Sequence, residues 1–250
     1  MTATRLFARR FVRLDGADRS IDVVAFLEPR ISNRITHYLP VWAGLLDDQG
    51  RVLFDFLVWP GGYGYLLDCE AAHAEALVEH LQPECAAAGI SVSIDDSLGA
   101  HYRAYSGDGA ASDPRHRALG QRWIEKVSSD DEGADERWLA CRLSLGIAEG
   151  RAELGFGELS WLQCNALELK GVTLDRHDFP GRSNLLTQMA KGVAERLVIV
   201  PSGMANDATR RSNHPDQGLS VDLRRPGNLP AGVIPDWLKA CFFCLVDASS

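Results

Sequence analysis

The chain has 250 residues, of which 46% are hydrophobic and 24% are charged, a composition typical of a globular protein with a large core. Its formal net charge of −8 argues against a nucleic-acid groove, because phosphate binding needs clustered Lys and Arg. No apolar run approaches the roughly 20 residues of a membrane span, so we expect no membrane association.

The termini and the cysteines indicate a cytoplasmic protein. Residues 1–10 carry basic side chains without a following apolar signal core, so we expect no cleavage there. Scattered cysteines in a chain of this size favour reduced thiols over a disulfide framework. Cys241 and Cys244 form a lone C-x-x-C in an apolar setting; zinc needs four ligands, so we interpret the pair as buried thiols and propose no metal. The six cysteines are Cys69, Cys85, Cys141, Cys164, Cys241 and Cys244.

The first hundred residues alternate strand patterns with one helical pattern. The elements expected here are a strand in 5–14, an apolar segment 21–27, a hairpin of 41–46 and 52–59, a strand near 63–67, a helix 71–81 that ends before Pro83, and a strand 90–94. This order predicts an α+β fold with an antiparallel sheet.

The rest of the chain is predicted to be helix-rich up to residue 194 and then β-rich. The expected elements are a flexible connection 104–118, a helix 117–127, a helix 138–146 closed by Gly146, a helix 185–194, a strand 197–200, a turn-rich segment 201–218 and an apolar segment 237–246. We predict two domains, a body of residues 1–190 and a small C-terminal domain of residues 191–250.

Residues 167–184 concentrate ionisable groups beside a turn. A strand-like run at Val172 and Leu174 leads into a charged segment, and Pro180-Gly181 then forces a turn. Loops carried on a strand often hold binding and catalytic groups. The alternative is an ordinary solvated turn. The charged and ionisable side chains are Asp175, Arg176, His177, Asp178 and Arg182.

The same stretch resembles the signature of the YgfZ-type family, the folate-binding relatives of the glycine-cleavage T-protein. That signature reads roughly N-G-V-S-F-x-K-G-C-[FYW]-x-G-Q-E. Gly171, Val172, Phe179 and Gly181 fit its frame, as do Thr173 and Leu174. The functional letters differ: Arg176 replaces Lys, His177 replaces Gly, Asp178 replaces Cys, and Arg182-Ser183 replaces Gln-Glu.

Further elements extend the resemblance over most of the chain. Residues 41–59 look like the family's hairpin, Asp113-Pro114-Arg115 with Leu119-Gly120 and Arg122 resembles D-P-R…L-G-x-R, and Arg142 with 146–150 resembles R…G-I-P-E-G. The resemblance implies a T-protein-type fold, which is a folate-binding α+β body with a ring-like domain arrangement, antiparallel sheets and a small β-rich C-terminal part.

The departures from the family fall on its functional letters. Where the family tends to have T-N-D, this chain has Ser32-Asn33-Arg34, so Arg34 stands in place of Asp. Where the family has P-L-E-x-N, with the Glu on the pterin, this chain has Gln163, which cannot supply negative charge. The basic run expected before the last strand is also changed, at 191–197. Because the frame is kept, we interpret the changes as a re-purposed pocket.

The exchanged residues suggest a site for a small carboxylate. Asp178 and His177 can handle protons near neutral pH, and since neighbours in extended chain face opposite sides, we expect one of them, Asp178, to face the cavity. Arginine pairs with carboxylates through two hydrogen bonds. The substrate-binding residues we predict are Arg34, Arg176, Arg182, Gln163 and Asn33, with Trp59 and Tyr65, beside Tyr63 and Trp161, as flat walls. Structural salt bridges and core packing are the alternatives for these residues.

Three functions fit these features. The first is an enzyme acting on a small, aromatic or otherwise conjugated carboxylate by acid–base bond cleavage, either lyase-type loss of a one-carbon unit or its transfer to tetrahydrofolate. The second is the common role in the family, a folate-dependent accessory factor for iron–sulfur cluster assembly or repair. The third is a folate-binding or regulatory protein without turnover. The expected cofactor is tetrahydrofolate and the expected partner is a small-molecule substrate; the oligomeric state is left open.

Overall fold

A computed structural model describes residues 3–36, 38–105, 107, 109–225 and 234–243. Among these residues, no helix is both long and apolar enough to cross a membrane. The prediction for Cys241 and Cys244 lies outside the side chains that the structure describes.

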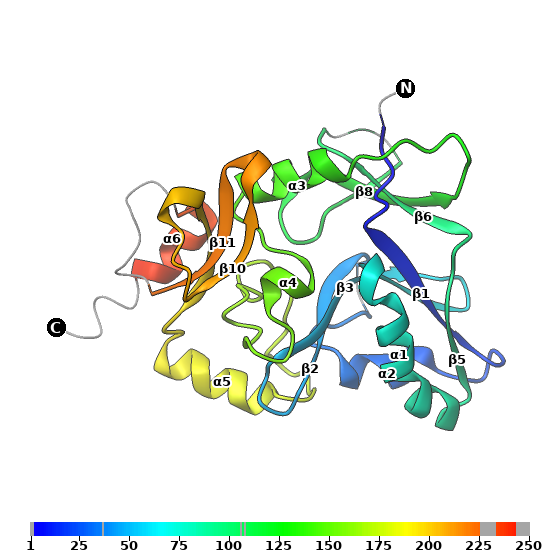
Figure 1. Cartoon of the computed structure of the whole chain (residues 1–250). Helices are drawn as coiled ribbons and strands as arrows, with labels where there is room; N and C mark the ends of the chain where they lie inside the picture. Colours follow the sequence, from blue (N-terminus) through cyan, green and yellow to red (C-terminus); the bar gives the residue numbers. More distant parts are fainter. Residues whose placement is uncertain (1–2, 37, 106, 108, 226–233, 244–250) are drawn as a thin grey trace.

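Runs of strands are separated by helices along the chain (Figure 1). The strands are β1 (Arg9–Gly16), β2 (Val41–Leu46), β3 (Val52–Pro60), β4 (Gly64–Glu70), β5 (Ile90–Ile94), β6 (Leu98–Arg103), β7 (Ala111–Ser112), β8 (Gln121–Lys126), β9 (Arg196–Pro201), β10 (Arg210–His214) and β11 (Leu219–Arg224). The helices are α1 (Val23–Leu27), α2 (Ala74–Ala87), α3 (Asp135–Ser144), α4 (Gly150–Leu154), α5 (Arg182–Lys191) and α6 (Asp236–Phe243).

The largest sheet has the antiparallel order β2-β3-β4-β1-β5. Because side chains alternate along a strand, β1 sends Val12 and Leu14 to the face covered by α2, where they pack with Leu77. Phe11 faces the other side and joins a second core with Trp42. The sheet is therefore buried on both faces.

The β2–β3 hairpin forms as its sequence predicts. Asp47 closes the turn, because its Oδ1 accepts the backbone N–H groups of Gln49 and Arg51 at 2.9 and 2.8 Å. Gly50 has φ of +77°, a left-handed conformation that favours glycine. The hairpin fixes the β2 edge of the sheet.

Three predictions of secondary structure are wrong. Helix α2 continues through Pro83. Proline removes one backbone hydrogen bond from the helix, but the burial of Leu81 and Cys85 on one face of the helix outweighs this loss. The expected helix 117–127 is largely strand β8, whose alternating residues pair with β6. The turn-rich segment 201–218 contains strand β10.

Two smaller sheets complete the molecule. One has the order β6-β8-β7, and the other has the order β10-β11-β9 and lies near α6 (Figure 1). The second sheet begins soon after the predicted boundary at residue 190 and shares a core with the body, since Leu197, Ile199 and Val221 belong to the same buried cluster as Trp161. His214 adds a contact of 2.9 Å to Glu153.

A buried ion network ties these layers together. Arg115 lies between Asp113 at 2.8 Å and Glu149 at 2.6 Å, and Asp68 pairs with Arg9 and Arg122, each at 2.7 Å. Arg9, Asp68 and Arg122 lie on β1, β4 and β8, and the other groups lie in the loops before β8 and α4. The pairs therefore join the large sheet to the β6-β8-β7 sheet.

The network keeps the carboxylate of Glu149 charged. Burial alone would raise the pKa of Glu149, but Arg9, Arg115 and Arg142 outweigh it and hold that pKa well below its usual range. Removing one partner of such a pair leaves an uncompensated buried charge, which costs about 3–5 kcal/mol. The D-P-R and G-I-A-E-G motifs therefore supply structural ion pairs.

Asp55 on β3 predicts a specific pH dependence of stability. Burial raises its pKa from 3.8 to about 6, although Arg9 opposes the change. The folded protein therefore keeps Asp55 protonated at pH values where the unfolded chain has already released this proton. Because ionisation of Asp55 then favours the unfolded state, the free energy of unfolding falls as the pH rises from about 4 to about 6. Asp55→Asn removes this loss, so its stability relative to the parent should rise by roughly 3 kcal/mol between pH 4 and pH 7.

Urea denaturation at intervals of pH measures this difference. The exposed Asp130→Asn is the control and should give a flat difference across the same range. A flat difference for Asp55→Asn would contradict the assignment.

Candidate functional site

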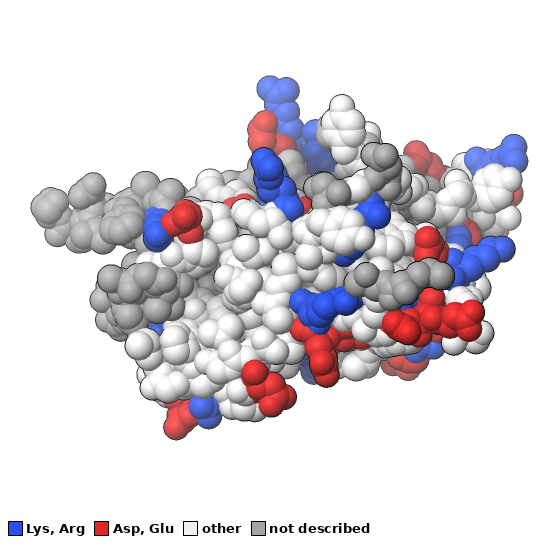
Figure 2. Space-filling view, turned by 90° about the horizontal axis from the view of Figure 1, so that it is seen from above, with Lys and Arg blue, Asp and Glu red and all other residues white. Residues whose placement is uncertain are grey.

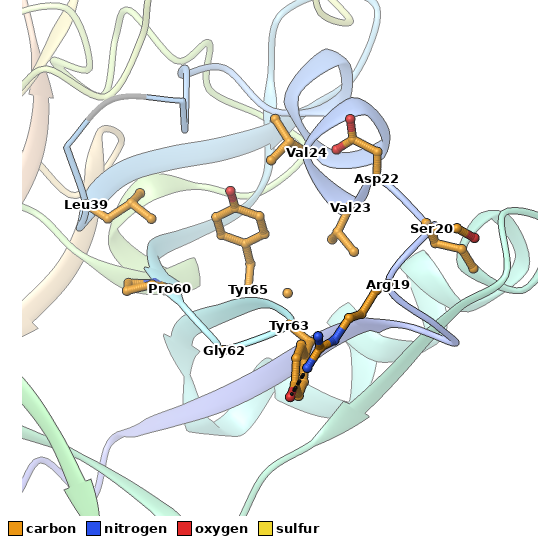
Figure 3. A pocket seen from close by; sticks show the side chains of 12 residues that line it. Arg19, Ser20, Asp22, Val23, Val24, Leu39, Pro60, Gly62, Tyr63 and Tyr65 are labelled. Atoms are coloured by element: carbon orange, nitrogen blue, oxygen red, sulfur yellow. Dashed lines mark hydrogen bonds between the residues drawn. The ribbon is translucent and has the colours of Figure 1, made fainter.

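A cavity of about 530 Å³, which we call cavity 1, opens between the start of α1 and the β3–β4 turn. Figure 3 shows Tyr65 in the middle of this cavity, with Leu39 and Val24 on either side of its ring. Its lining residues are Arg19, Ser20, Ile21, Asp22, Val23, Val24, Leu39, Pro60, Gly62, Tyr63, Gly64 and Tyr65.

The walls of cavity 1 combine flat rings with charged groups at the rim. Arg19 lies over the ring of Tyr63 at 5.0 Å from its centroid and donates to the Tyr63 hydroxyl at 2.9 Å (Figure 3). Asp22 is the N-cap of α1, and its carboxylate accepts the backbone N–H of Ala25 at 3.0 Å. The rim thus presents one cation and one carboxylate.

In the described part of the chain, Arg34 is connected to cavity 1 only through Glu28. Burial raises the pKa of Tyr65, and the carboxylates of Asp22 and Glu28 raise it further. Glu28 also accepts a hydrogen bond of 3.2 Å from Arg34 Nε. The Arg34 guanidinium is therefore neutralised by Glu28, and Arg34 does not line the cavity.

The structure joins the segment before Arg34 to the signature stretch, in what we call the clamp (residues 31–33 against residues 170–177). Asn33 Nδ2 donates to the carbonyls of Trp42 at 2.9 Å and Lys170 at 2.7 Å. Its Oδ1 accepts from the Thr173 hydroxyl at 2.6 Å. The Ser32 hydroxyl donates to the carbonyl of Gly171, also at 2.6 Å. The two stretches with exchanged functional letters are in direct contact.

The signature residues divide between the interior and the surface. His177 is buried, its Nε2 lies 2.9 Å from the carbonyl oxygen of Ile31, and its ring packs on Phe179 at 5.2 Å. Asp178 and Arg176 are exposed. His177 and Asp178 face opposite sides, as predicted, but the prediction that Asp178 faces inward is wrong, because His177 is the buried residue.

The remaining predicted residues are held by local contacts. Arg182 donates to the carbonyl of Leu174 through Nε at 3.1 Å and Nη2 at 2.7 Å. Gln163 Oε1 accepts the backbone N–H of Ser160 at 3.0 Å. Trp59 is 8% exposed and packs in the core. Of the residues predicted to bind or wall the substrate, Tyr65 and Tyr63 line cavity 1, whereas Arg34, Arg176, Arg182, Gln163, Asn33, Trp59 and Trp161 do not.

Sequence reasoning did not single out Arg19, Asp22 or Glu28. An Asp directly before an apolar helical run is an N-cap signal, so Asp22 was detectable. Nothing local indicates that Arg19 reaches Tyr63, a contact that spans 44 positions in the chain.

The three buried cysteines among the described residues are held as unreactive thiols. Burial raises the pKa of Cys69 to about 12 and that of Cys85 to about 11, and it raises the pKa of Cys164 as well. Thiolates are the reactive form of cysteine, so these three thiols are poor nucleophiles. Within the described residues, no group of three or more His, Cys, Asp and Glu side chains is arranged to hold a metal ion.

Comparison with known proteins places the fold. No family model matches the chain. The chain is 24% identical over 233 residues to a Neurospora crassa protein named iron–sulfur cluster assembly factor IBA57 homolog, mitochondrial; the match covers 78% of this chain and 52% of that protein. The chain therefore spans about half the length of this curated relative.

A solved structure, glycine cleavage system aminomethyltransferase T from Bartonella henselae, matches with a TM-score of 0.61. The match covers 90% of this chain and 79% of that chain at 11% sequence identity. The predicted T-protein-like α+β fold is confirmed, and so is the resemblance to the YgfZ-type family.

Asn33 should stabilise the clamp strongly. Asn33→Leu keeps the volume of the side chain but leaves two carbonyl oxygens and the Thr173 hydroxyl without their partner, so we expect a loss of about 2–4 kcal/mol in the free energy of unfolding. Arg34→Gln is the control, because its pair with Glu28 is partly exposed and such pairs contribute at most about 1 kcal/mol. Chemical denaturation measures both; equal losses would show that Asn33 has no special role.

Proposed function

We propose that the chain is a folate-linked accessory factor for iron–sulfur cluster assembly or repair. The observation that carries this proposal is the 24% identity over 78% of the chain to a protein named as an assembly factor. The T-protein fold over 90% of the chain supports the folate part. We retain a cytoplasmic location in the proposal because of the scattered cysteines, although the relative is named mitochondrial.

Cavity 1 fits a folate in size and in wall chemistry. Its volume of about 530 Å³ lies within the roughly 300–1,000 Å³ of small-molecule sites. Tyr65 offers a flat ring for a pterin, Asp22 offers a carboxylate for ring N–H groups, and Arg19 offers a cation for the glutamate tail. Tetrahydrofolate, when bound, would supply its one-carbon and redox chemistry, while these residues hold and orient it.

Binding of tetrahydrofolate tests this assignment. A ligand at about 100 times its Kd stabilises the folded state by about 2.7 kcal/mol, which raises Tm by roughly 5–10 °C for a chain of this size. Tyr65→Ala should abolish most of that rise, because it removes the ring against which the pterin stacks. Phe7→Ala removes an exposed ring outside cavity 1 and should keep the full rise. No stabilisation of the parent protein by tetrahydrofolate would refute the folate part.

Asp178 distinguishes the accessory role from catalysis by the signature loop. Asp178 is exposed and, in the described part of the chain, has no hydrogen-bond or ion-pair partner. Asp178→Cys restores the cysteine that the resembled family has at this position. If the chain is an assembly factor, cells that lack it should recover iron–sulfur enzyme activity with Asp178→Cys at least as well as with the parent.

A second proposal is the enzyme that acts on a small conjugated carboxylate by loss or transfer of a one-carbon unit. The exposed and unpartnered Asp178 and Arg176 favour it, since both remain available to a ligand. For such an enzyme, Asp178→Cys should lower turnover by at least about 10²-fold if Asp178 moves the proton, whereas Asp175→Asn, at the neighbouring exposed carboxylate, should not. Rescue of iron–sulfur enzymes by Asp178→Cys would exclude this second proposal.

A further inference from the structure

A second cavity, of about 300 Å³, lies between the N-terminal segment, the end of β6 and α3; we call it cavity 2. The elements around it lie at the top of Figure 1, and Figure 2 shows the molecule from that side, with a largely uncharged surface and charges in separate groups. Its lining residues are Ala3, Thr4, Tyr102, Arg103, Ala104, Tyr105, Arg137 and Cys141. No residue is common to cavities 1 and 2.

The floor of cavity 2 is a buried aromatic surface. Tyr102 is 2% exposed, and its ring meets Trp138 edge-on with centroids 4.9 Å apart. Burial raises the pKa of Tyr102, and its hydrogen bond with the Cys141 thiol raises it further. The phenol is therefore neutral, and because a thiol is a weak partner, its hydroxyl keeps the capacity to bind a polar group of a ligand.

The rim of cavity 2 is cationic. Arg103 and Arg137 both line it, and no carboxylate is among its described lining residues. Arg103 lies against Tyr105 and Trp123, with its guanidinium carbon 5.6 and 5.4 Å from their ring centroids. Arg137 donates through Nη2 to the carbonyl of Ala3, which is a neutral acceptor. The two charged side chains among the described lining residues are therefore both cationic.

Arg137 has donors to spare for an anion. A guanidinium carries five N–H groups in a planar fork, and in the described part of the chain no carboxylate lies within ion-pair distance of Arg137. Arginine binds carboxylates through two parallel hydrogen bonds. An anion at this position would therefore gain charge-assisted bonds without displacing an existing ion pair.

We propose that cavity 2 binds a small aromatic carboxylate. Its carboxylate pairs with Arg137 at the rim, and its ring enters between the exposed Tyr105 and the buried Tyr102. A volume of about 300 Å³ is at the small end of ligand sites and suits one ring rather than a folate. The two arginines disfavour cations, and the tyrosine walls favour a flat ring over inorganic anions. This site is independent of the folate proposed for cavity 1.

Calorimetric titration of the full chain with benzoate tests the proposal. We expect saturable binding with a Kd on the order of 1 mM or tighter for a ligand of this size. Benzamide lacks the charge and cyclohexanecarboxylate lacks the flat ring, so both should bind more weakly. No saturable binding of benzoate up to about 10 mM, or equal binding of benzamide, would overturn the proposal.

Two variants locate the site. Arg137→Gln at an exposed position should weaken benzoate binding by about 10-fold or more, and Ala104→Trp, also exposed, should block the cavity and abolish binding. The matched control Arg117→Gln removes an exposed arginine outside both cavities and should leave Kd unchanged. Thermal melting confirms that each variant is folded. Unchanged binding by both Arg137→Gln and Ala104→Trp would overturn the assignment.

Competition separates this proposal from the folate proposal. Excess tetrahydrofolate should not change the Kd of benzoate, because the two ligands occupy different cavities. Displacement of benzoate by tetrahydrofolate would mean a shared site and would overturn the proposal for cavity 2. Absence of tetrahydrofolate binding, with benzoate binding intact, would overturn the folate assignment alone.

Discussion

The arrangement of the molecule depends on the buried guanidinium of Arg115, which lies between the carboxylates of Asp113 and Glu149. Asp113 and Arg115 belong to the loop before β8, and Glu149 directly precedes α4. Through Arg9, the network also reaches Asp68 on the large sheet. An ion pair in the interior is tolerated only when every charge has its partner, so these pairs constrain how the large sheet and the β6-β8-β7 sheet are placed against each other.

The clamp is linked to cavity 1 through Arg34 and Glu28. The clamp ties the segment before Arg34 to the signature stretch, and Arg34 then reaches Glu28, whose charge acts on Tyr65 in cavity 1. His177 is held in the interior by a separate contact, between its Nε2 and the carbonyl of Ile31, whereas Asp178 is exposed. The exchanged residues of the signature thus lie in the interior or on the surface and do not line cavity 1, so the proposal for function rests on the sequence match, the fold and the cavity.

Arginine side chains of this chain serve in three different settings. Arg9, Arg115 and Arg122 are buried structural cations, and Arg34 and Arg182 are held by a carboxylate and a carbonyl of their own neighbourhood. Arg137 meets only a neutral carbonyl among its described partners. Residue type alone does not distinguish these settings, because the difference lies in what each guanidinium meets across the fold.

The sequence by itself determined the elements whose signals are local. The turn of Asp47 and Gly50 predicted the hairpin, alternation predicted β5, and the family-like motifs predicted the T-protein fold. Tertiary structure decided the rest, because long-range contacts outweigh local preference: pairing with β6 made 117–127 mostly a strand, and burial carried α2 through Pro83. The partners of Arg34, His177 and Tyr102 were likewise decided only by packing, since each lies on another element and no spacing in the sequence encodes such a contact.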